Sequence, residues 1–473
     1  MKSKIQNPVF IIAVLGLCVR IFFLLIGAKY YFGRENIFVD LDTQAWQECI
    51  TTFIDTGTYS TNRISEYGYF IRMPGYSFFI GIFYLLSGQN WDIAFPLIGW
   101  FQTILDFFII LLIYRVGLNI FNKKNMSLIL SALYAFYPFI IVWTPVVYSE
   151  HTSIVLLLLS INYFFHPAKN KFWLSGVLIG IAVLFRPQLI LLMPIMILAL
   201  LLFYKVRSEF FRKAFIFSFM FLLAYSPWPL RNYINYNKII LTQDLRGAKN
   251  WNVDVISFMQ YIYSVKSGWE PQFSEIIGNK KTKWPAESYL SEEDSAKLHR
   301  VAYLSQNCGS GFGNWMGYWK EPVAADSNCN AEIKKIFDEL REEQMKKNPV
   351  NFWIKVPMQN LKKGIFKLTL TDTSTFVKKA ASILFIYRTF LLLCGMLGLW
   401  LMYRQKGIIR IAAIIIGLYF ISLYVLLCSG TAPQFRNIEM RYFLPADILM
   451  LIPAAFVFNN FYERFFQKNN ISE

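Results

Sequence analysis

The residues best suited to chemistry lie in one polar stretch, residues 36–76. Two carboxylates, Asp40 and Asp42, occur there with one cation, Arg72, which precedes a Pro-Gly turn. A carboxylate can act as a general base toward a hydroxyl group, and an arginine can bind a phosphate through two hydrogen bonds. This pair of functions suits group transfer from a phosphate-linked donor. The alternative is structural: Asp42 would cap a helix that begins near Thr43, as aspartate often does.

The composition indicates a helical membrane protein. The chain has 473 residues, of which 55% are hydrophobic, 18% aromatic and 16% charged, which is too apolar for a soluble protein of this length. The net charge of +17 does not indicate a nucleic-acid partner, because basic residues of membrane proteins gather in cytoplasmic loops. The six cysteines lack CxxC spacing and the three histidines are scattered, so no zinc motif is present. No Gly-rich nucleotide-binding loop occurs either.

Ten apolar runs are candidate membrane spans. The first is expected to be a signal anchor rather than a cleaved signal peptide. Lysine and arginine cluster before the first run and after every second run, which places these connections and both termini in the cytoplasm. The runs are 8–30, 92–115, 126–146, 151–167, 172–185, 188–204, 214–230, 380–403, 409–428 and 442–461.

Two apolar segments depart from this pattern. Residues 75–90 would form a helix of roughly 24 Å, which is short of the ~30 Å hydrocarbon core. We therefore expect a re-entrant or interface-lying helix there. The break at Arg186-Pro187 joins two short runs and is expected to lie in a water-filled cavity, where irregular backbone is tolerated.

The predicted topology divides the chain into three regions. They are an N-terminal transmembrane catalytic module (1–230) that includes the first outer loop (31–91), an extracytoplasmic loop region (231–379), and C-terminal transmembrane helices (380–473). The middle region ends in a charged helical stretch, 331–347, and an amphipathic run, 352–370, which is typical of a helix lying on a membrane. It also contains Cys308 and Cys329, which either form a disulfide, as an oxidising compartment permits, or remain two free buried thiols.

Two charged residues lie inside predicted spans, Arg20 in the first and Asp106 in the second. Their depths, counted from the cytoplasmic side, are similar. We expect them to pair, because pairing lowers the cost of burying both charges, and we expect the pair to be structural.

The polar motifs of the chain all fall on the predicted outer side, and in this order they resemble the GT-C glycosyltransferases that use polyprenyl-phosphate donors. The branch they resemble is the bacterial one related to protein O-mannosyltransferases and to the lipid A aminoarabinose transferase. The resemblance covers residues 5–255 and returns at Arg441-Tyr442. The motifs are residues 40–42, 72–76, 149–150, 186–187, 227–232 and 439–445.

The resemblance implies roles for individual residues. Counting back from the turn at 57–59 makes Asp42 the catalytic base, with Asp40 as the alternative, since many relatives have two adjacent acids where this chain has Asp-Leu-Asp. Glu150 corresponds to the acid of the second outer loop and Arg72 to the donor-phosphate ligand.

Further cations are available for the leaving phosphate, whose negative charge must be stabilised. Arg231 matches a family motif, and Arg186 and Arg441 are additional candidates. The alternative for Arg231 and Arg441 is anchoring at the membrane edge. No metal ion is required, because a lipid phosphate is a fair leaving group, although an Asp/Glu pair leaves room for a divalent metal.

The sequence thus predicts an all-α, polytopic membrane protein with about ten spans, one re-entrant or interfacial helix and a large extracytoplasmic loop region. The expected location is a bacterial inner or plasma membrane with an extracytoplasmic active site. The resemblance implies transfer of a sugar, with inversion, from a polyprenyl-phosphate donor to a hydroxyl of a lipid, glycan or protein. The rival functions are a transporter or flippase, although no inverted repeat supports it, and a polysaccharide polymerase or ligase.

Overall fold

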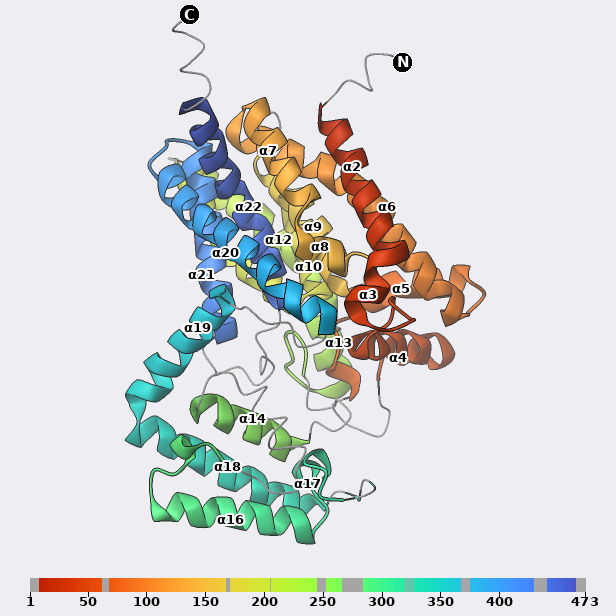
Figure 1. The fold of residues 1–473 in the computed structure, drawn as a ribbon, viewed down its shortest axis with the longest axis vertical. Helices are drawn as coiled ribbons and strands as arrows, with labels where there is room; N and C mark the ends of the chain where they lie inside the picture. Colours follow the sequence, from red (N-terminus) through yellow and green to blue (C-terminus); the bar gives the residue numbers. More distant parts are fainter. Residues whose placement is uncertain are drawn as a thin grey trace, which may run out of the picture.

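A computed structural model gives the fold of the chain (Figure 1). The described parts are residues 8–61, 68–166, 171–204, 206–244, 252–265, 284–319, 321, 323–324, 326–366, 375–428 and 440–464. Over these residues the protein is built from helices and contains no strand, which confirms the all-α fold class.

Five helical segments are long and apolar enough to cross a membrane. The first is continuous through helix α2 (Pro8–Phe22), a π-helical turn η1 (Phe23–Gly27) and α3 (Ala28–Phe32). The others are α6 (Trp91–Phe121), the apolar part of α20 (Thr375–Tyr403), α21 (Ile408–Cys428), and α22 (Met440–Tyr462). They coincide with the first, second, eighth, ninth and tenth predicted spans.

The remaining predicted spans are also helical, but they are short or broken, and three of the breaks precede a proline. Proline has no N–H and clashes with the preceding turn, so it is favoured in the first turn of a helix and costly in the interior. Pro138, Pro187 and Pro227 each begin a new helix. The helices are α7 (Lys124–Ala135) with α8 (Pro138–Trp143), α9 (Ser149–Phe164), α10 (Phe172–Phe185), η3 (Pro187–Leu191) with α11 (Leu192–Phe203), and α12 (Arg207–Tyr225) with α13 (Pro227–Tyr236), the last pair bent by 49°.

The segment predicted not to cross is a short helix, α5 (Pro74–Leu86). Its 13 residues reach about 20 Å, so the expectation of a short helix holds. It packs against α6 and α10 and against α4 (Leu41–Thr56) of the first outer loop. Its approach to α4 is close, since a Cβ on Gly81 would meet the Ile50 side chain at 2.5 Å.

The predicted ion pair between Arg20 and Asp106 is confirmed. Both side chains are buried, and Asp106 also accepts a hydrogen bond from the Tyr134 hydroxyl at 2.7 Å and lies 3.0 Å from Nε2 of His151. The carboxylate is therefore surrounded by partners from α2, α7 and α9, which ties these helices to α6.

A second buried ion pair, Arg388 with Asp447, was not predicted from the sequence. The Arg388 guanidinium donates to both carboxylate oxygens of Asp447, at 2.7 and 3.1 Å. The hydroxyl of Tyr137 donates to the same carboxylate at 3.0 Å, and the Tyr424 hydroxyl accepts from Arg388 at 2.7 Å. This network joins α20, α21 and α22 to the segment between α7 and α8.

Helices α14 (Val253–Val265), α16 (Glu292–Asn307), α17 (Gly311–Trp315) and α18 (Ser327–Lys347) form a small domain with its own core. Phe258, Phe312 and Phe337 lie at its centre. A disulfide joins Cys308 to Cys329, which confirms the disulfide alternative. In Figure 1 this domain lies at the end of the molecule remote from the start of α2 and the end of α22.

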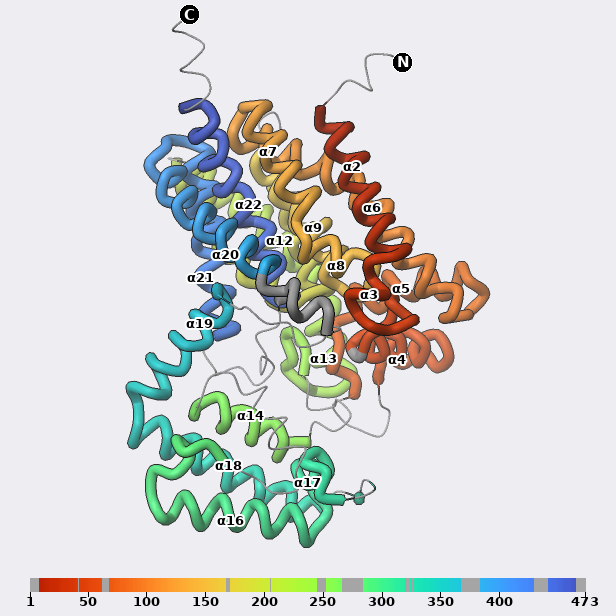
Figure 2. Tube along the Cα trace, viewed as in Figure 1, coloured from red at the N-terminus to blue at the C-terminus, as the bar shows by residue number. Residues whose placement is uncertain are grey.

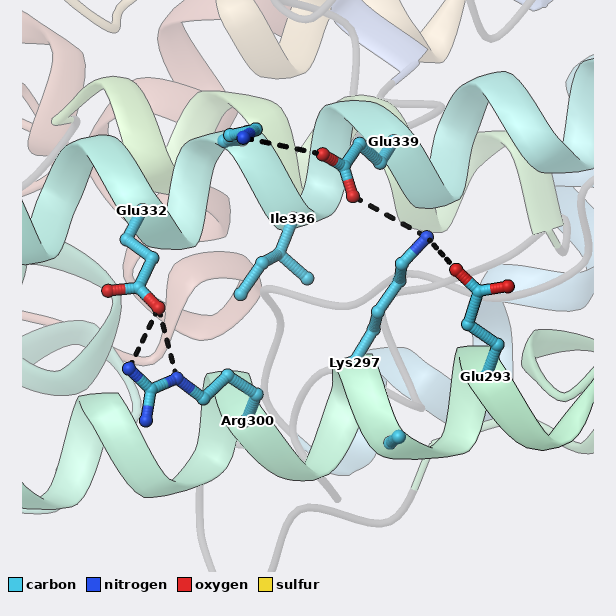
Figure 3. A pocket seen from close by; sticks show the side chains of 8 residues that line it. Glu293, Lys297, Arg300, Glu332, Ile336 and Glu339 are labelled. Carbon is cyan, nitrogen blue, oxygen red and sulfur yellow. Dashed lines mark hydrogen bonds and ion pairs between the residues drawn. The ribbon is translucent and has the colours of Figure 1, made fainter.

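Ion pairs cover the outer groove between α16 and α18 (Figure 3). Lys297 pairs with Glu293 at 3.1 Å and with Glu339 at 3.4 Å, while Arg300 pairs with Glu332 at 2.9 Å. The predicted charged helix at 331–347 is thus confirmed as part of α18, and its charges hold α16 in register.

The chain returns to the bundle through η6 (Asn351–Lys355) and α19 (Val356–Phe366), as Figure 2 traces. One face of α19 packs on α21 and α20. Asn360 donates to the carbonyl of Cys428 at 3.2 Å, and Arg388 donates to the carbonyl of Gly364 at 2.7 Å. Residues 367–370 of the predicted amphipathic run lie outside the described residues, and its placement on a membrane surface stays a prediction.

Candidate active site

The first outer loop places Asp42 in the first turn of α4, where the helix dipole favours a carboxylate. The capping interpretation required Asp42 to precede the helix; since α4 begins at Leu41, that interpretation is wrong. The Asp42 carboxylate is instead held by two arginines. Oδ1 lies 2.6 Å from Nη2 of Arg72, and Oδ2 lies 2.6 Å from Nη2 of Arg441.

These contacts control the charge of Asp42. Burial alone would raise the pKa of its carboxyl group, but the positive charges of Arg441 and Arg72 outweigh burial. Together with their hydrogen bonds, they hold the pKa of Asp42 well below its ordinary value. Asp42 is therefore ionised throughout the physiological range.

Glu150 lies on the other side of Arg441. It is in the first turn of α9 and almost completely buried. Its Oε1 atom lies 2.5 Å from Nη1 of Arg186 and 3.9 Å from Nη1 of Arg441. Arg441 thus links the two acids, and five of the seven predicted site residues form one cluster: Asp42, Arg72, Glu150, Arg186 and Arg441.

Aromatic rings line the cluster. The Arg72 guanidinium lies 4.6 Å from the centre of the Trp46 ring, and that of Arg441 lies 4.7 Å from the ring of Tyr148. Such rings fix a guanidinium in place and stabilise its charge. The sequence analysis missed both, although Trp46 stands four residues after Asp42, on the same helical face, and Tyr148 directly precedes the 149–150 motif.

The other two predicted site residues lie elsewhere. Asp40 pairs with Arg34 at 3.3 Å. Arg231 donates to the backbone carbonyl groups of Tyr59 and Tyr69, each at 2.8 Å. Arg231 therefore joins two parts of the segment between α4 and α5 through these hydrogen bonds. Its role toward phosphate stays a prediction.

The described residues bring two carboxylates into the cluster as groups that could bind a metal ion. Over the described residues, no group of three or more metal-binding side chains of His, Cys, Asp or Glu occurs. These two acids, Asp42 and Glu150, both contact Arg441. Among the described residues, three guanidiniums accompany these two carboxylates, and this surplus of positive charge favours an anion.

Comparisons with known proteins give one family match and several structural matches. Residues 72–230 match the family model described as dolichyl-phosphate-mannose-protein mannosyltransferase. This segment includes Arg72, Glu150 and Arg186 but begins after Asp42. Among curated protein sequences, none matches the chain.

Solved structures share the fold. The chain is similar to the oligosaccharyltransferase of Archaeoglobus fulgidus crystallised with zinc and sulfate, at 14% identity and a TM-score of 0.51, covering 98% of this chain and 51% of that one. The same enzyme, AglB, with an inhibitory peptide and a dolichol-phosphate matches at 13% identity and a TM-score of 0.51, covering 98% and 52%. This chain thus spans about half the length of that enzyme.

A further similarity is weaker. ArnT from Cupriavidus metallidurans matches at 11% identity and a TM-score of 0.37, covering 93% of this chain and 76% of that one. This score is too low to support an argument about the fold.

The helical architecture, the family match over residues 72–230 and the shared fold make the chain similar to membrane glycosyltransferases. This similarity agrees with the resemblance of its motifs to the GT-C glycosyltransferases.

Proposed function

We propose that the protein transfers a sugar from a polyprenyl-phosphate donor to an acceptor hydroxyl at the extracytoplasmic face of the membrane. The supporting observation is the convergence of Asp42 and Glu150 with Arg72, Arg186 and Arg441. Guanidinium groups stay protonated, so the three cations and two carboxylates that the structure describes there leave one net positive charge. A sugar linked to a lipid through one phosphate carries one negative charge, which the cluster would neutralise.

In this proposal Asp42 is the general base. It takes the proton of the acceptor hydroxyl while the hydroxyl oxygen attacks the anomeric carbon, and the bond from that carbon to the phosphate oxygen breaks. A single displacement of this kind inverts the anomeric configuration. The electron pair goes to the phosphate, where the growing charge is stabilised by arginine.

The proposed reaction requires a lipid-phosphate donor and an acceptor that carries a hydroxyl group. The related structures include dolichol-phosphate on the archaeal oligosaccharyltransferase, which supports a polyprenyl-phosphate donor. The acceptor is a hydroxyl of a lipid, a glycan or a protein. We assign the outward orientation, in a bacterial inner or plasma membrane, from the basic residues of alternate connections.

The test compares cells that carry the wild-type chain, Asp42→Asn, or no copy of the protein. Mass spectrometry of surface glycans and glycoproteins should show a sugar-modified product with the wild type alone. In isolated membranes, Asp42→Asn should lower transfer from the polyprenyl-phosphate sugar pool by about 10²–10⁴-fold.

Asp40→Asn is the matched comparison, with equal protein levels, because Asp40 pairs with Arg34 outside the cluster. Its loss of transfer should be smaller. Near-normal transfer by Asp42→Asn would contradict the proposal, and loss only with Asp40→Asn would assign the base to Asp40 instead.

A further inference from the structure

Arg441 stands between two carboxylates at unequal distances. Its guanidinium lies 2.6 Å from Asp42 and 3.9 Å from Glu150. Both acids are fixed by another arginine, Asp42 by Arg72 and Glu150 by Arg186. A movement of Arg441 of little more than one bond length would therefore exchange one carboxylate for the other.

Glu150 can accept a further hydrogen bond. Its contacts with Arg186 and Arg441 both involve Oε1. Its Oε2 atom is buried and, among the described residues, has no hydrogen-bond partner. An unsatisfied buried carboxylate oxygen is costly, and a carboxylate can accept from two guanidiniums at once.

The resting contacts of Asp42 oppose its proposed role. A carboxylate that accepts from two guanidiniums within 2.6 Å is a weak proton acceptor, because protonation would break both charged hydrogen bonds. Efficient base catalysis requires that these contacts loosen when the substrate is present.

We propose that Arg441 moves from Asp42 to Glu150 when the donor phosphate binds to Arg72, so that Asp42 becomes an effective base only in the donor complex. This inference rests on the proposed function. It makes Glu150 a positioning residue: it accepts Arg441 and acts on the reaction through Asp42.

The charges balance at every stage. With the donor bound, the three arginines oppose Asp42, Glu150 and one phosphate charge. During transfer the proton of the acceptor moves to Asp42, while the breaking bond leaves a second negative charge on the lipid phosphate. The net charge of the cluster is unchanged, and release of lipid phosphate and proton restores the resting pair.

Several other charged or titratable groups surround Asp42 and must be considered in any pH measurement. Tyr148, which precedes α9, and Tyr442, which follows Arg441 on α22, both lie against the Arg441 guanidinium. Asp40 lies on the same loop and pairs with Arg34. None of these replaces the two arginines as a direct ion-pair partner of Asp42.

The first test is infrared difference spectroscopy of the purified protein, with Asp42→Asn as the subtraction standard. The probe is polyprenyl phosphate without a sugar. Without it, the carboxylic-acid band of Asp42 should be absent down to pH 4. With it, the band should appear with a midpoint at or above the ordinary aspartate pKa of about 3.9.

The outcomes of this test are distinct. If polyprenyl phosphate binds and leaves the midpoint unchanged, the exchange of Arg441 is contradicted while the proposed function stands. If it does not bind at all, both are contradicted.

The second test is a double-mutant cycle on the transfer reaction. Glu150→Gln should lower kcat roughly tenfold or more without weakening the binding of polyprenyl phosphate, because Arg441 then stays on Asp42. Adding Arg441→Gln should restore part of the lost rate.

The matched control adds Arg34→Gln to Glu150→Gln, which removes a nearby cation outside the cluster and should restore nothing. If the double variant Glu150→Gln/Arg441→Gln is slower than Glu150→Gln alone, Arg441 serves only as a phosphate ligand and the inference fails.

Discussion

The Arg441 cluster (Asp42, Arg72, Glu150, Arg186 and Arg441) and the Arg388–Asp447 network both pair arginine with aspartate, yet their construction differs. Asp447 is 1% exposed and meets one arginine and two tyrosine hydroxyls, with charges matched one to one. The side chain of Asp42 is 28% exposed and belongs to a cluster with a surplus cation. In the Arg388–Asp447 network, here called closed, the two charges neutralise each other, so it offers no charge to a ligand. The Arg441 cluster, here called open, is partly exposed and attracts an anion.

The Arg20–Asp106 pair resembles the closed network. Its members are fully buried, and the carboxylate has partners on both oxygens. The difference between the two kinds of cluster indicates which ion pairs stabilise the bundle and which can exchange partners. Exchange requires access, an excess of one charge and an oxygen without a partner; of the three clusters compared, the Arg441 cluster combines them among the described residues.

The largest expected effect is on the closed network. Asp447→Asn should lower the free energy of unfolding by about 3–5 kcal/mol, because it leaves Arg388 buried without its counter-charge. Thermal unfolding in detergent would measure this loss. Asp42→Asn, measured alongside, should change stability far less, since Asp42 is partly exposed; an equal loss in both variants would remove the distinction between the clusters.

A buried carboxylate that has no arginine partner in the described part of the chain extends the comparison. Asp254, in α14, accepts a hydrogen bond from the Phe312 N–H at 2.7 Å. Burial raises the pKa of Asp254 to about 6, against the opposing effect of that hydrogen bond. The folded state therefore binds the proton more tightly than the unfolded state, so stability should be highest below pH 4 and fall as the pH rises to 6.

Asp254→Asn should abolish this fall. The variant should be more stable than the wild type by up to about 3 kcal/mol at pH 7, with the difference disappearing near pH 4. Hydrogen exchange of the α14 amides, followed by mass spectrometry, would locate the effect in this domain. A difference that does not depend on pH would contradict the assignment to Asp254.

A smaller effect is expected at Arg72. Arg72→Ala removes one charged hydrogen bond to Asp42, and in the proposed reaction one to the donor phosphate. Such bonds contribute about 1.5–3 kcal/mol, so kcat/KM for the donor should fall by about 10–100-fold. Kinetics at varied donor concentration should show a higher KM as well as slower turnover, whereas an unchanged KM would mean that Arg72 does not hold the ground-state phosphate.

The smallest effect is expected for the exposed pair beside the site. Arg34 lies 3.3 Å from Asp40, and both side chains are partly exposed. Arg34→Gln should change the free energy of unfolding by less than about 1 kcal/mol and leave transfer at the wild-type rate. A large loss of transfer would show that the functional cluster includes Asp40 and Arg34.

Much of the fold follows from local properties of the sequence. Apolar run length located the helices, and prolines account for three of the breaks between them. The break after the charged stretch at 331–347 was also visible, because Asn348-Pro349 ends α18. The pair Arg388 and Asp447 was not predicted. Each is a single charged residue inside an apolar span, and only the packing of the two spans shows that they are partners.

The sequence by itself determined the membrane class, the order of the outer motifs and the choice of Asp42 and Arg72 as neighbours in one loop. Only the tertiary structure decided which cations reach the carboxylates. Arg231 and Arg441 are both arginines in outer motifs, yet one donates to backbone carbonyls and the other bridges Asp42 and Glu150. Helix periodicity and apolar length act over neighbouring residues, whereas ion pairing depends on distance and desolvation in space. Helix α22 packs beside α9 and beside the segment that holds Asp42, although these elements are far apart in the chain. This packing sets both the distance between the charges and their desolvation.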